Sequence, residues 1–550
     1  MWTEKTCTIT FDANGGTITT ATQTVKAGIA AALKTATELG LSRRNYKFAG
    51  WATKSDATEA EYADGAEVTL SDNLTLCAIW NELPVNEQPL TLEFIDSGTI
   101  TITNRWSSLK YSINGGDLTD ATDSITVAAG DKVCFYAQGS EYIGYDDALQ
   151  QINCDADCYL YGNIMSLVTL TENGEWNPFE TSLRGRYLYG YDHTFSSLFY
   201  NNTHIKNHDS KQIILPATEL DSYTYSCMFY GCTGLTSAPD LPAEELEQGC
   251  YKSMFSGCTS LKTAPKLSVK YIAYEACKQM FFGCTSLEEV PEISAECVFM
   301  YGCFCMFEGC TSLTAAPLLP AETLAEGCYA NMFSGCTSLT TAPSLPAETL
   351  AEYCYDSMFY GCTSLTTAPE LKATTLAENC YNSMFCGCTS LTTAPELKAT
   401  TLAEYCYAFM FYGCTSLTTA PELKATTLAK CCCTNMFVAC TSLATAPELK
   451  ATTLAEHCYN SMFSECTSLT TAPELPAETL ADYCYAYMFS GCTSLNYVKC
   501  LATNIYSTYC TDEWLDGVST SGTFVKAKDM TLWESGVSGI PSGWTVENAE

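Results

Sequence analysis

The chain has 550 residues, and its 62 acidic side chains against 27 lysines and arginines give a formal net charge of −35. Hydrophobic residues make up 47% of the sequence, too many for a disordered acidic chain, and no apolar run reaches the roughly 18 residues that span a bilayer. The acidity argues against nucleic acid or anionic membranes as partners, because phosphate binding needs clustered basic residues. The 34 cysteines could be disulfides, metal ligands or buried thiols.

The first predicted element is an alternating strand from Cys7 to Phe11, followed by a turn at Asn14 and Gly15 and a later strand ending in Trp80. This pattern predicts a small β-rich domain. Three segments resemble the Listeria–Bacteroides repeat of cell-wall and surface proteins: TITFDANGGT at 8–17, FAGWAT at 48–53 and LTLCAIW at 74–80. The resemblance implies a β-grasp module over residues 1–80 that acts as a spacer or binding module, although residues 35–46 lack the family's Pro-containing loop.

Residues 81–90 read as a polar, proline-containing linker, and residues 91–170 as a β-sandwich-like domain. Alternating apolar residues predict strands at 92–94, 99–102 and 133–136. Turns are expected at 114–116 and 129–131, where glycine follows asparagine or alanine. We expect residues 171–227 to hold an entry segment and an N-terminal capping repeat, because Leu198 and Leu215 fit a repeat with a four-residue insertion.

A 26-residue repeat occupies residues 228–513. The dipeptide Met-Phe recurs without insertion at Met228, Met254, Met280, Met306, Met332, Met358, Met384, Met410, Met436, Met462 and Met488. In one unit, Leu350, Cys354 and Met358 stand at i, i+4 and i+8, which predicts an amphipathic helix. Thr349 and Glu352 fit a capping box at its start, and Gly361 fits its end.

The second half of each unit predicts a short strand, because residues 364–368 include β-branched residues and Pro369 follows them. Such units cannot bury their apolar faces alone, so they are expected to stack into a solenoid. Since helices are wider than strands, the array should curve, with the strands on its concave face. Residues 514–550, with Trp514 and Leu515 in a decayed unit, are expected to form a C-terminal cap.

Twenty of the cysteines fall into two columns of this repeat. One lies four residues after each methionine, at Cys232, Cys258, Cys284, Cys310, Cys336, Cys362, Cys388, Cys414, Cys440, Cys466 and Cys492. The other lies four residues before it, at Cys250, Cys328, Cys354, Cys380, Cys406, Cys432, Cys458, Cys484 and Cys510. The register favours buried thiols. Disulfides along the first column and zinc sites remain the alternatives.

The motif Met-Phe-x-Gly-Cys-Thr-Ser-Leu-Thr-Thr-Ala-Pro resembles the BspA-like leucine-rich repeats of bacterial surface proteins over roughly residues 190–515. The resemblance implies an extracellular solenoid associated with adhesion to host proteins or other bacteria, and it brings no catalytic residues. The predicted fold is therefore a curved α/β repeat solenoid, leucine-rich-repeat-like, with 26-residue units of short strand plus helix, preceded by two small β-rich domains.

Motifs for enzymatic chemistry are missing from the sequence, which has no G-x-S-x-G, P-loop, H-E-x-x-H or dinucleotide-binding fingerprint. His204 and His208 have a spacing that could ligate a metal on a helix, but they lie in a polar insertion where a solvated loop is favoured. Cys154 and Cys158 could form a disulfide, a weak metal site or a simple thiol pair. We therefore predict a non-enzymatic protein without catalytic residues, metal or cofactor.

The candidate partner-binding surface consists of side chains that recur from unit to unit. Threonine, glutamate and lysine columns are expected on the strand face, with lysines offsetting the repulsion between glutamates, and tyrosines on the helix side. These residues are Thr366, Thr392, Thr418, Glu370, Glu396, Glu422, Glu448, Lys372, Lys398, Lys424, Tyr353, Tyr405 and Tyr483. The second tyrosine of each pair, as in Tyr355, is expected to pack between units.

Two classes of function follow from these patterns. The first is a cell-surface or secreted solenoid that binds a protein partner on host or bacterial cells. The second is a structural spacer or antigenic display array, and glycan binding is a more distant alternative. The N-terminal residues have no apolar core of a signal peptide, so we expect an extracellular protein whose export signal precedes this chain.

Overall fold

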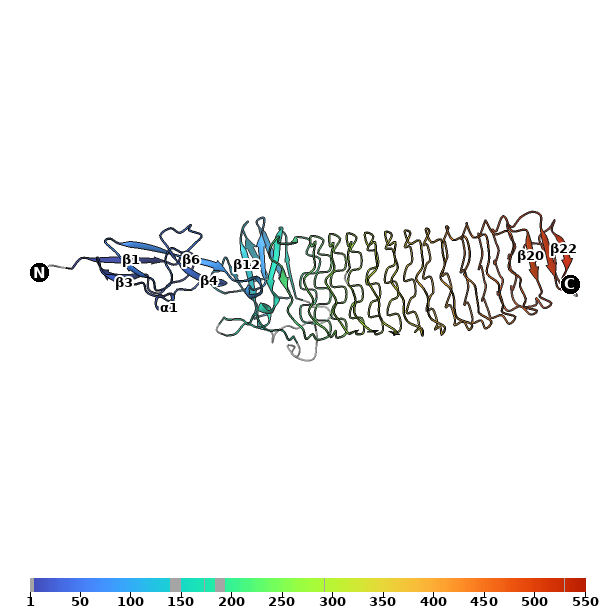
Figure 1. The fold of residues 1–550 in the computed structure, drawn as a ribbon, viewed down its shortest axis with the longest axis horizontal. Helices are drawn as coiled ribbons and strands as arrows, with labels where there is room; N and C mark the ends of the chain where they lie inside the picture. The colour runs from blue at the N-terminus through green and yellow to red at the C-terminus, as the bar shows by residue number, and fades with distance from the viewer. Residues whose placement is uncertain (1–3, 139–149, 173, 184–192, 291, 529) are drawn as a thin grey trace. The chain divides into compact units, whose positions relative to one another are not determined.

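The computed structural model describes residues 4–138, 150–172, 174–183, 193–290, 292–528 and 530–550 (Figure 1). The chain divides into two compact units. Unit 1 comprises the described residues of Met1–Thr181 together with His204–Pro216. Unit 2 comprises Ser182, Leu183, the described residues of Tyr191–Thr203, and those of Ala217–Glu550.

The N-terminal part of unit 1 is a β-rich module, as predicted. Its main sheet has the order β2-β1-β6-β4, in which β1 runs parallel to β6. The elements are β1 (Thr6–Asp12), β2 (Thr22–Lys26), β3 (Ala30–Ala32), α1 (Ala36–Leu39), β4 (Tyr46–Ala52), β5 (Glu67–Thr69) and β6 (Leu74–Glu82). In β1 the side chains of Cys7, Ile9 and Phe11 are buried while their neighbours face outward, which is the alternation that predicted this strand.

The rest of unit 1 contains two further sheets, ordered β10-β9-β12-β7-β14-β15 and β11-β8-β13, with β16 pairing β14. Their strands are β7 (Thr91–Phe94), β8 (Gly98–Thr103), β9 (Lys110–Ile113), β10 (Thr119–Asp120), β11 (Ser124–Val127), β12 (Lys132–Tyr136), β13 (Gln151–Cys154), β14 (Cys158–Asn163), β15 (Ile205–Asn207) and β16 (Ile213–Ile214). In the described residues the strands are accompanied by the 3₁₀ turns η1 (Val85–Glu87) and η3 (Ile164–Leu167). The predicted strands at 92–94, 99–102 and 133–136 are confirmed as parts of β7, β8 and β12.

Unit 2 is a solenoid whose coils are stacked one behind the next, drawn green to red in Figure 1. Continuous strands are short and parallel, and they lie near the two ends of the repeat array. They are β17 (Tyr271–Ile272), β18 (Cys297–Val298), β19 (Thr323–Leu324), β20 (Tyr497–Cys500), β21 (Thr523–Lys526) and β22 (Thr545–Asn548). Between β19 and β20 the coils are joined by single parallel bridges, such as Thr367 with Thr393.

The predicted helix in each unit is wrong, because that half of the coil is a ladder of turns. Tyr353, Ser357 and Gly361 have φ of 55°, 53° and 68°, so every fourth residue is left-handed, whereas an α-helix needs φ near −63° throughout. Successive backbone N–H groups bond alternately to a carbonyl of the same coil and to a carbonyl of the next coil. Met358 N–H bonds the Tyr355 carbonyl three residues back, while Phe359 N–H bonds Met384 in the following coil, at 2.9 Å.

The apolar spacing that suggested a helix is real but has a different origin. Leu350, Cys354 and Met358 are all buried, as the i, i+4, i+8 pattern requires. A four-residue succession of turns presents the same positions inward as a 3.6-residue helix over this short length. The threonine of the expected capping box, Thr349, instead forms a parallel bridge with Thr375.

The turn ladder also removes the reason for the predicted curvature. A helical side would have to be wider than a strand side, because helices are about 10 Å across. Here both halves of the coil are joined to the next coil by backbone hydrogen bonds, which set similar spacings on both sides. The coils accordingly follow a nearly straight path within this unit (Figure 1).

The core of unit 2 is a set of stacked columns. Phenylalanine rings lie face to face from coil to coil, as in Phe333, Phe359 and Phe385, whose centroids are 5.8 and 5.7 Å apart. Tyrosines form a second column, in which Tyr355 is buried and stacks on Tyr381, confirming that the second tyrosine of each pair packs between units. Near the C-terminal end, Trp514 stacks on Tyr485 and donates its Nε1 hydrogen to the Gly539 carbonyl.

Candidate binding surface

The predicted threonine column lies in the half of the coil that carries the parallel bridges, where Thr366, Thr392 and Thr418 are all exposed. The Thr392 hydroxyl donates to the Thr366 carbonyl at 3.2 Å, and the Thr392 N–H donates to the same oxygen. Methyl groups and hydroxyl oxygens therefore recur along this half of the coil at the interval between coils.

Glutamates and lysines form a staircase of ion pairs beside the threonines. Each pair joins a lysine to the glutamate 28 residues earlier, at 2.8 Å for Lys398 with Glu370, and Lys424 pairs with Glu396 in the same way. Further along, Lys450 reaches Glu422 at 2.8 Å and Glu448 at 3.8 Å. The glutamates are exposed and the lysines, including Lys372, are half-buried, so the pairs are solvated and individually weak.

The three candidate tyrosines lie in the turn ladder, at left-handed positions, and not beside the threonines. Tyr353 is exposed, whereas Tyr405 and Tyr483 are partly covered. Tyr483 stacks between His457 and Tyr509, with ring centroids 4.5 and 5.3 Å away. The structure therefore brings together the threonine, glutamate and lysine columns but places the tyrosines in the other half of the coil.

The cysteine columns are part of the core and not of a surface. All 34 cysteines are described, and all are free thiols. From Cys258 onward, each thiol of the first column donates to the carbonyl of a phenylalanine 29 residues earlier; Cys362, for example, lies 3.1 Å from the Phe333 oxygen. Cys232 donates to Phe199, which is 33 residues earlier. Burial raises the pKa of Cys336 and of Cys388 to about 12, so these thiols stay protonated and unreactive.

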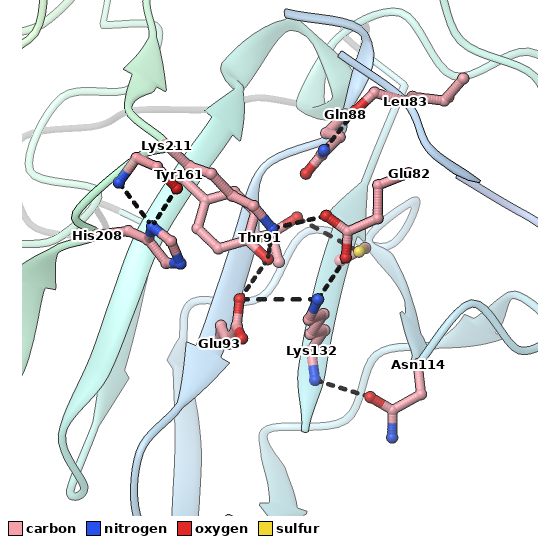
Figure 2. A network of polar contacts seen from close by, with 12 residues as sticks. Glu82, Leu83, Gln88, Thr91, Glu93, Asn114, Lys132, Tyr161, His208 and Lys211 are labelled. Atoms are coloured by element: carbon pink, nitrogen blue, oxygen red, sulfur yellow. Dashed lines mark hydrogen bonds and ion pairs between the residues drawn. The ribbon is translucent and has the colours of Figure 1, made fainter. Parts of the chain in front are cut away.

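A second cluster of polar residues lies in unit 1, where the module meets the neighbouring sheet (Figure 2). Glu82, at the end of β6, accepts from Lys132 at 2.5 Å and from Lys211 at 2.7 Å. The ammonium group of Lys211 also lies 4.5 Å from the centroid of the Tyr161 ring. The Tyr161 hydroxyl donates to Glu93 at 2.8 Å. This arrangement, the junction cluster, binds three separate segments of unit 1 together.

Electrostatics in the junction cluster favour ionised groups. Burial would raise the pKa of Glu82, but hydrogen bonds from Lys132 and Lys211 outweigh it and hold that pKa below its ordinary value. The pKa of Lys132 is likewise raised, because the bond to Glu82 outweighs burial. Burial and the bond to Glu93 raise the pKa of Tyr161. The cluster is thus a saturated structural network whose charges are compensated.

Two other sequence candidates have structural partners. His204 contacts Asp157 with a 3.1 Å distance from Nδ1 to Oδ1, and His208 packs edge-on against Tyr159 and Tyr161. The segment between them is strand β15 and not a helix or a solvated loop. Cys154 and Cys158 are a buried thiol pair with sulfurs 3.4 Å apart. Among the described residues, no group of three or more His, Cys, Asp or Glu side chains could hold a metal ion.

Comparison with known families now bears on both units. Residues 8–79 match the model of the Listeria-Bacteroides repeat domain, and residues 278–418 and 404–513 match the BspA type leucine rich repeat region, in six copies. The solenoid carries BspA-type leucine-rich repeats. Both resemblances found in the sequence are thereby confirmed. Comparison with curated proteins gives no match.

BspA-type repeats and the Listeria-Bacteroides repeat are typical of surface proteins and are typically non-catalytic. The BspA-type repeats also suggest protein–protein interaction. Within the described part of the chain, no helix has the length and apolar character to cross a membrane. The BspA-type match begins at residue 278, whereas the Met-Phe register begins at Met228. The earlier coils keep the spacing, and residues 254–265 keep the motif except at Lys262.

The junction cluster escaped sequence reasoning. Glu82 lies 50 residues from Lys132 and 129 from Lys211, and no periodicity links them. In the BspA-type repeats, in contrast, the columns can be found from the sequence because their residues recur every 26 positions. The one local signal in this part of unit 1 is the adjacent pair Arg43 and Arg44, which is unusual in so acidic a chain.

Proposed function

We propose that this protein is a non-catalytic cell-surface or secreted protein whose BspA-type repeats bind a protein partner and mediate adhesion to host or other cells. The observation that carries the proposal is the exposed threonine column flanked by the Glu–Lys staircase. Thr366, Thr392 and Thr418 are exposed on successive coils, and the charged side chains beside them are solvated. Such a surface offers a partner the same contact several times, which favours binding through many weak contacts.

The net charge of the chain indicates what kind of surface the partner should have. The net charge of −35 favours a protein with basic patches, because long-range attraction speeds the encounter of oppositely charged surfaces. The ion pairs along the staircase leave a local surface that is close to neutral. We therefore expect overall charge to steer association and the threonine column to make the contact.

A structural spacer is the second candidate, and the regularity of the coils favours it. Stacked rings and coil-to-coil hydrogen bonds repeat with little variation, as for Phe359 and Phe385. A uniform array suits a rigid stalk, since a single shaped pocket would need units that differ. The two functions differ in whether the repeat surface itself binds a partner protein.

Binding of the full chain to a panel of immobilised extracellular host proteins and to whole bacterial cells tests the proposal. Changing the predicted column to lysine, as Thr366→Lys, Thr392→Lys and Thr418→Lys together, should weaken binding by about tenfold or more. The matched control changes three other exposed threonines of neighbouring coils, as Thr374→Lys, Thr400→Lys and Thr426→Lys. It adds the same charge and should leave the affinity unchanged.

The tyrosine positions need a separate variant, since they lie in the other half of the coil. Tyr353→Ser, Tyr405→Ser and Tyr483→Ser together should leave binding intact if the threonine column makes the contact. Loss of binding only in this variant would move the interface to the turn ladder. Failure of the unaltered chain to bind any protein or cell in the panel would leave the spacer as the function.

A further inference from the structure

A groove in unit 1, next to the junction cluster, encloses about 620 Å³. It lies between two loops of the N-terminal module and two loops of the following sheets, and its lining includes Thr17, Ser42, Arg43, Arg44, Asp117 and Trp176. This volume is within the range of clefts that bind small molecules, about 300–1,000 Å³. Neither the repeat surface nor the junction cluster accounts for the groove.

Two glycine turns of the same type form part of its rim. Asn14 and Gly15 have φ of 45° and 86°, and Asn114 and Gly115 have φ of 54° and 79°. A Cβ atom on Gly115 would lie 3.1 Å from the Arg44 carbonyl oxygen, so the close approach of the two loops depends on glycine. The rim therefore exposes backbone instead of bulky side chains and leaves the groove open.

The arginines of the groove have no carboxylate partner in the part of the chain that the structure describes. The Arg43 guanidinium lies over the Tyr46 ring, 3.9 Å from its centroid, and its buried Nε has no hydrogen-bond acceptor among the described residues. Arg44 donates to the Gly174 carbonyl at 2.9 Å. The lysines of the junction cluster, in contrast, share Glu82. The groove thus holds two arginines that form no ion pair with a carboxylate of the described residues, in a protein of net charge −35.

The other lining groups narrow the ligand class. Asp117 and Glu175 also line the groove, so a polyanion such as a sulfated chain or a nucleic acid would meet repulsion. A ligand with one negative charge and several hydroxyl groups suits the lining better. Its carboxylate fits the fork of an arginine, and its hydroxyls can donate to Asp117 and Glu175.

Hydroxyl and aromatic groups complete this set. Thr17 and Ser42 have their hydroxyl oxygens 2.9 Å apart at the rim. Trp176 packs against the buried cluster of Cys134, Tyr136 and Leu170, and it contributes an aromatic side chain to the lining of the groove. We propose that this groove binds a carboxylated sugar, a uronic acid residue of an acidic glycan, with Arg43 binding its carboxylate. The site is independent of the repeat surface and of the function proposed for it.

Calorimetric titration of the full chain with methyl galacturonoside, which carries one carboxylate, and with neutral methyl galactoside as the matched probe, tests the proposal. The unaltered protein should bind the acidic sugar, and the neutral one should bind about tenfold more weakly or worse. Arg43→Gln should weaken binding of methyl galacturonoside by about tenfold or more, because it removes a charge-assisted hydrogen bond. Arg43→Lys keeps the charge over Tyr46 but loses the fork, so an intermediate loss is expected.

The control is Arg105→Gln, because Arg105 pairs with Asp123 and does not line the groove. It should bind methyl galacturonoside like the unaltered protein. Equal affinity for the acidic and neutral sugars, unchanged binding by both Arg43 variants, or no binding at all would overturn the proposal. Displacement of the sugar by inorganic phosphate at the same concentration as by free galacturonate would also overturn it, since it would show a general anion site.

Discussion

The coils of unit 2 and the junction cluster of unit 1 both hold together segments that are far apart in the sequence. They do so with different kinds of contact. Between coils, the connections are backbone hydrogen bonds, ring stacks and side-chain pairs that recur at a fixed interval, as for Phe359 and Phe385 or Lys398 and Glu370. In unit 1, the connection is a unique set of charged side chains, with Lys132 and Lys211 converging on Glu82.

This difference shows where distinctive chemistry can arise. A column of identical residues cannot gather several different functional groups at one point, because each coil presents the same groups as its neighbour. The loops of unit 1 carry residues that occur once, and they bring arginines, carboxylates and a tryptophan around one groove. The solenoid therefore suits a repeated, extended contact, and unit 1 suits a single small ligand.

The largest expected effect comes from breaking the phenylalanine column. Phe359 is fully buried and stacks on both neighbours, so Phe359→Ala should lower the free energy of unfolding by about 3–5 kcal/mol. The midpoint of urea unfolding, followed by ring fluorescence, measures it. Tyr360→Ala, at the exposed adjacent residue, is the control and should change stability by less than about 0.5 kcal/mol. Equal effects of the two would contradict the stacked core.

Unit 1 should respond to loss of one charge. Lys211→Met removes the 2.7 Å pair with Glu82 and the contact with the Tyr161 ring, and should destabilise unit 1 by about 1–2 kcal/mol. Because the pKa of Glu82 is lowered in the fold, its contribution is present above the pKa of an unfolded carboxyl and is lost as pH falls through the folded value. The difference between variant and unaltered protein should therefore shrink in acid.

Urea unfolding at pH 7 and at acid pH measures this difference. Lys54→Met, at an exposed lysine elsewhere in unit 1, is the control and should have little effect at either pH. A destabilisation by Lys211→Met that is the same at both pH values would mean that the ion pair with Glu82 is not its cause.

A partly buried carboxyl in the turn ladder should make the solenoid sensitive to pH. Burial raises the pKa of Asp356 to about 7, and the equivalent residue of the next coil is Asn382. A raised folded pKa means that stability is greatest below the unfolded pKa and is lost as pH rises through about 7. Asp356→Asn should match the unaltered protein near pH 4 and exceed it by about 1 kcal/mol near pH 8. Parallel melting curves at all pH values would contradict the raised pKa.

The smallest effect is expected at the tyrosine column. The hydroxyl of Tyr355 is buried without a hydrogen-bond partner among the described residues. Tyr355→Phe removes this group without opening a cavity, so stability should be unchanged or rise by up to about 1 kcal/mol. Tyr353→Phe, at the exposed tyrosine two residues earlier, should have no effect. A clear loss of stability in thermal unfolding of Tyr355→Phe would show that the hydroxyl has a partner.

The sequence predicted the inward positions of the coil but not its backbone. Leu350, Cys354 and Met358 are buried as expected, because the burial pattern depends only on a period near four. That period does not distinguish a helix from consecutive turns. The left-handed conformation of Tyr353 and Ser357 distinguishes the turns from a helix. Neither residue is a glycine, so the sequence does not indicate this conformation.

For the candidate sites, the sequence located the repeated columns but neither the junction cluster nor the groove. Repetition locates the threonine and charge columns by number, and Lys398 with Glu370 shows the compensation that the sequence predicted. The junction cluster depends on contacts between residues far apart in the chain, and a single sequence has no pattern that reports them. The Arg43–Arg44 pair is visible, but its open groove depends on the packing of four loops.

Far-ultraviolet circular dichroism of the full chain tests the central claim, that the coils are turn ladders joined by backbone hydrogen bonds, most directly. In the described residues the only α-helix is the four-residue α1, so we predict a spectrum of turns and β-structure without the paired helical minima. One helix of roughly eleven residues in each of the eleven repeats would instead make about a fifth of the chain helical. The spectrum would then show the paired minima of helical proteins. A helical signal of that size would contradict the account.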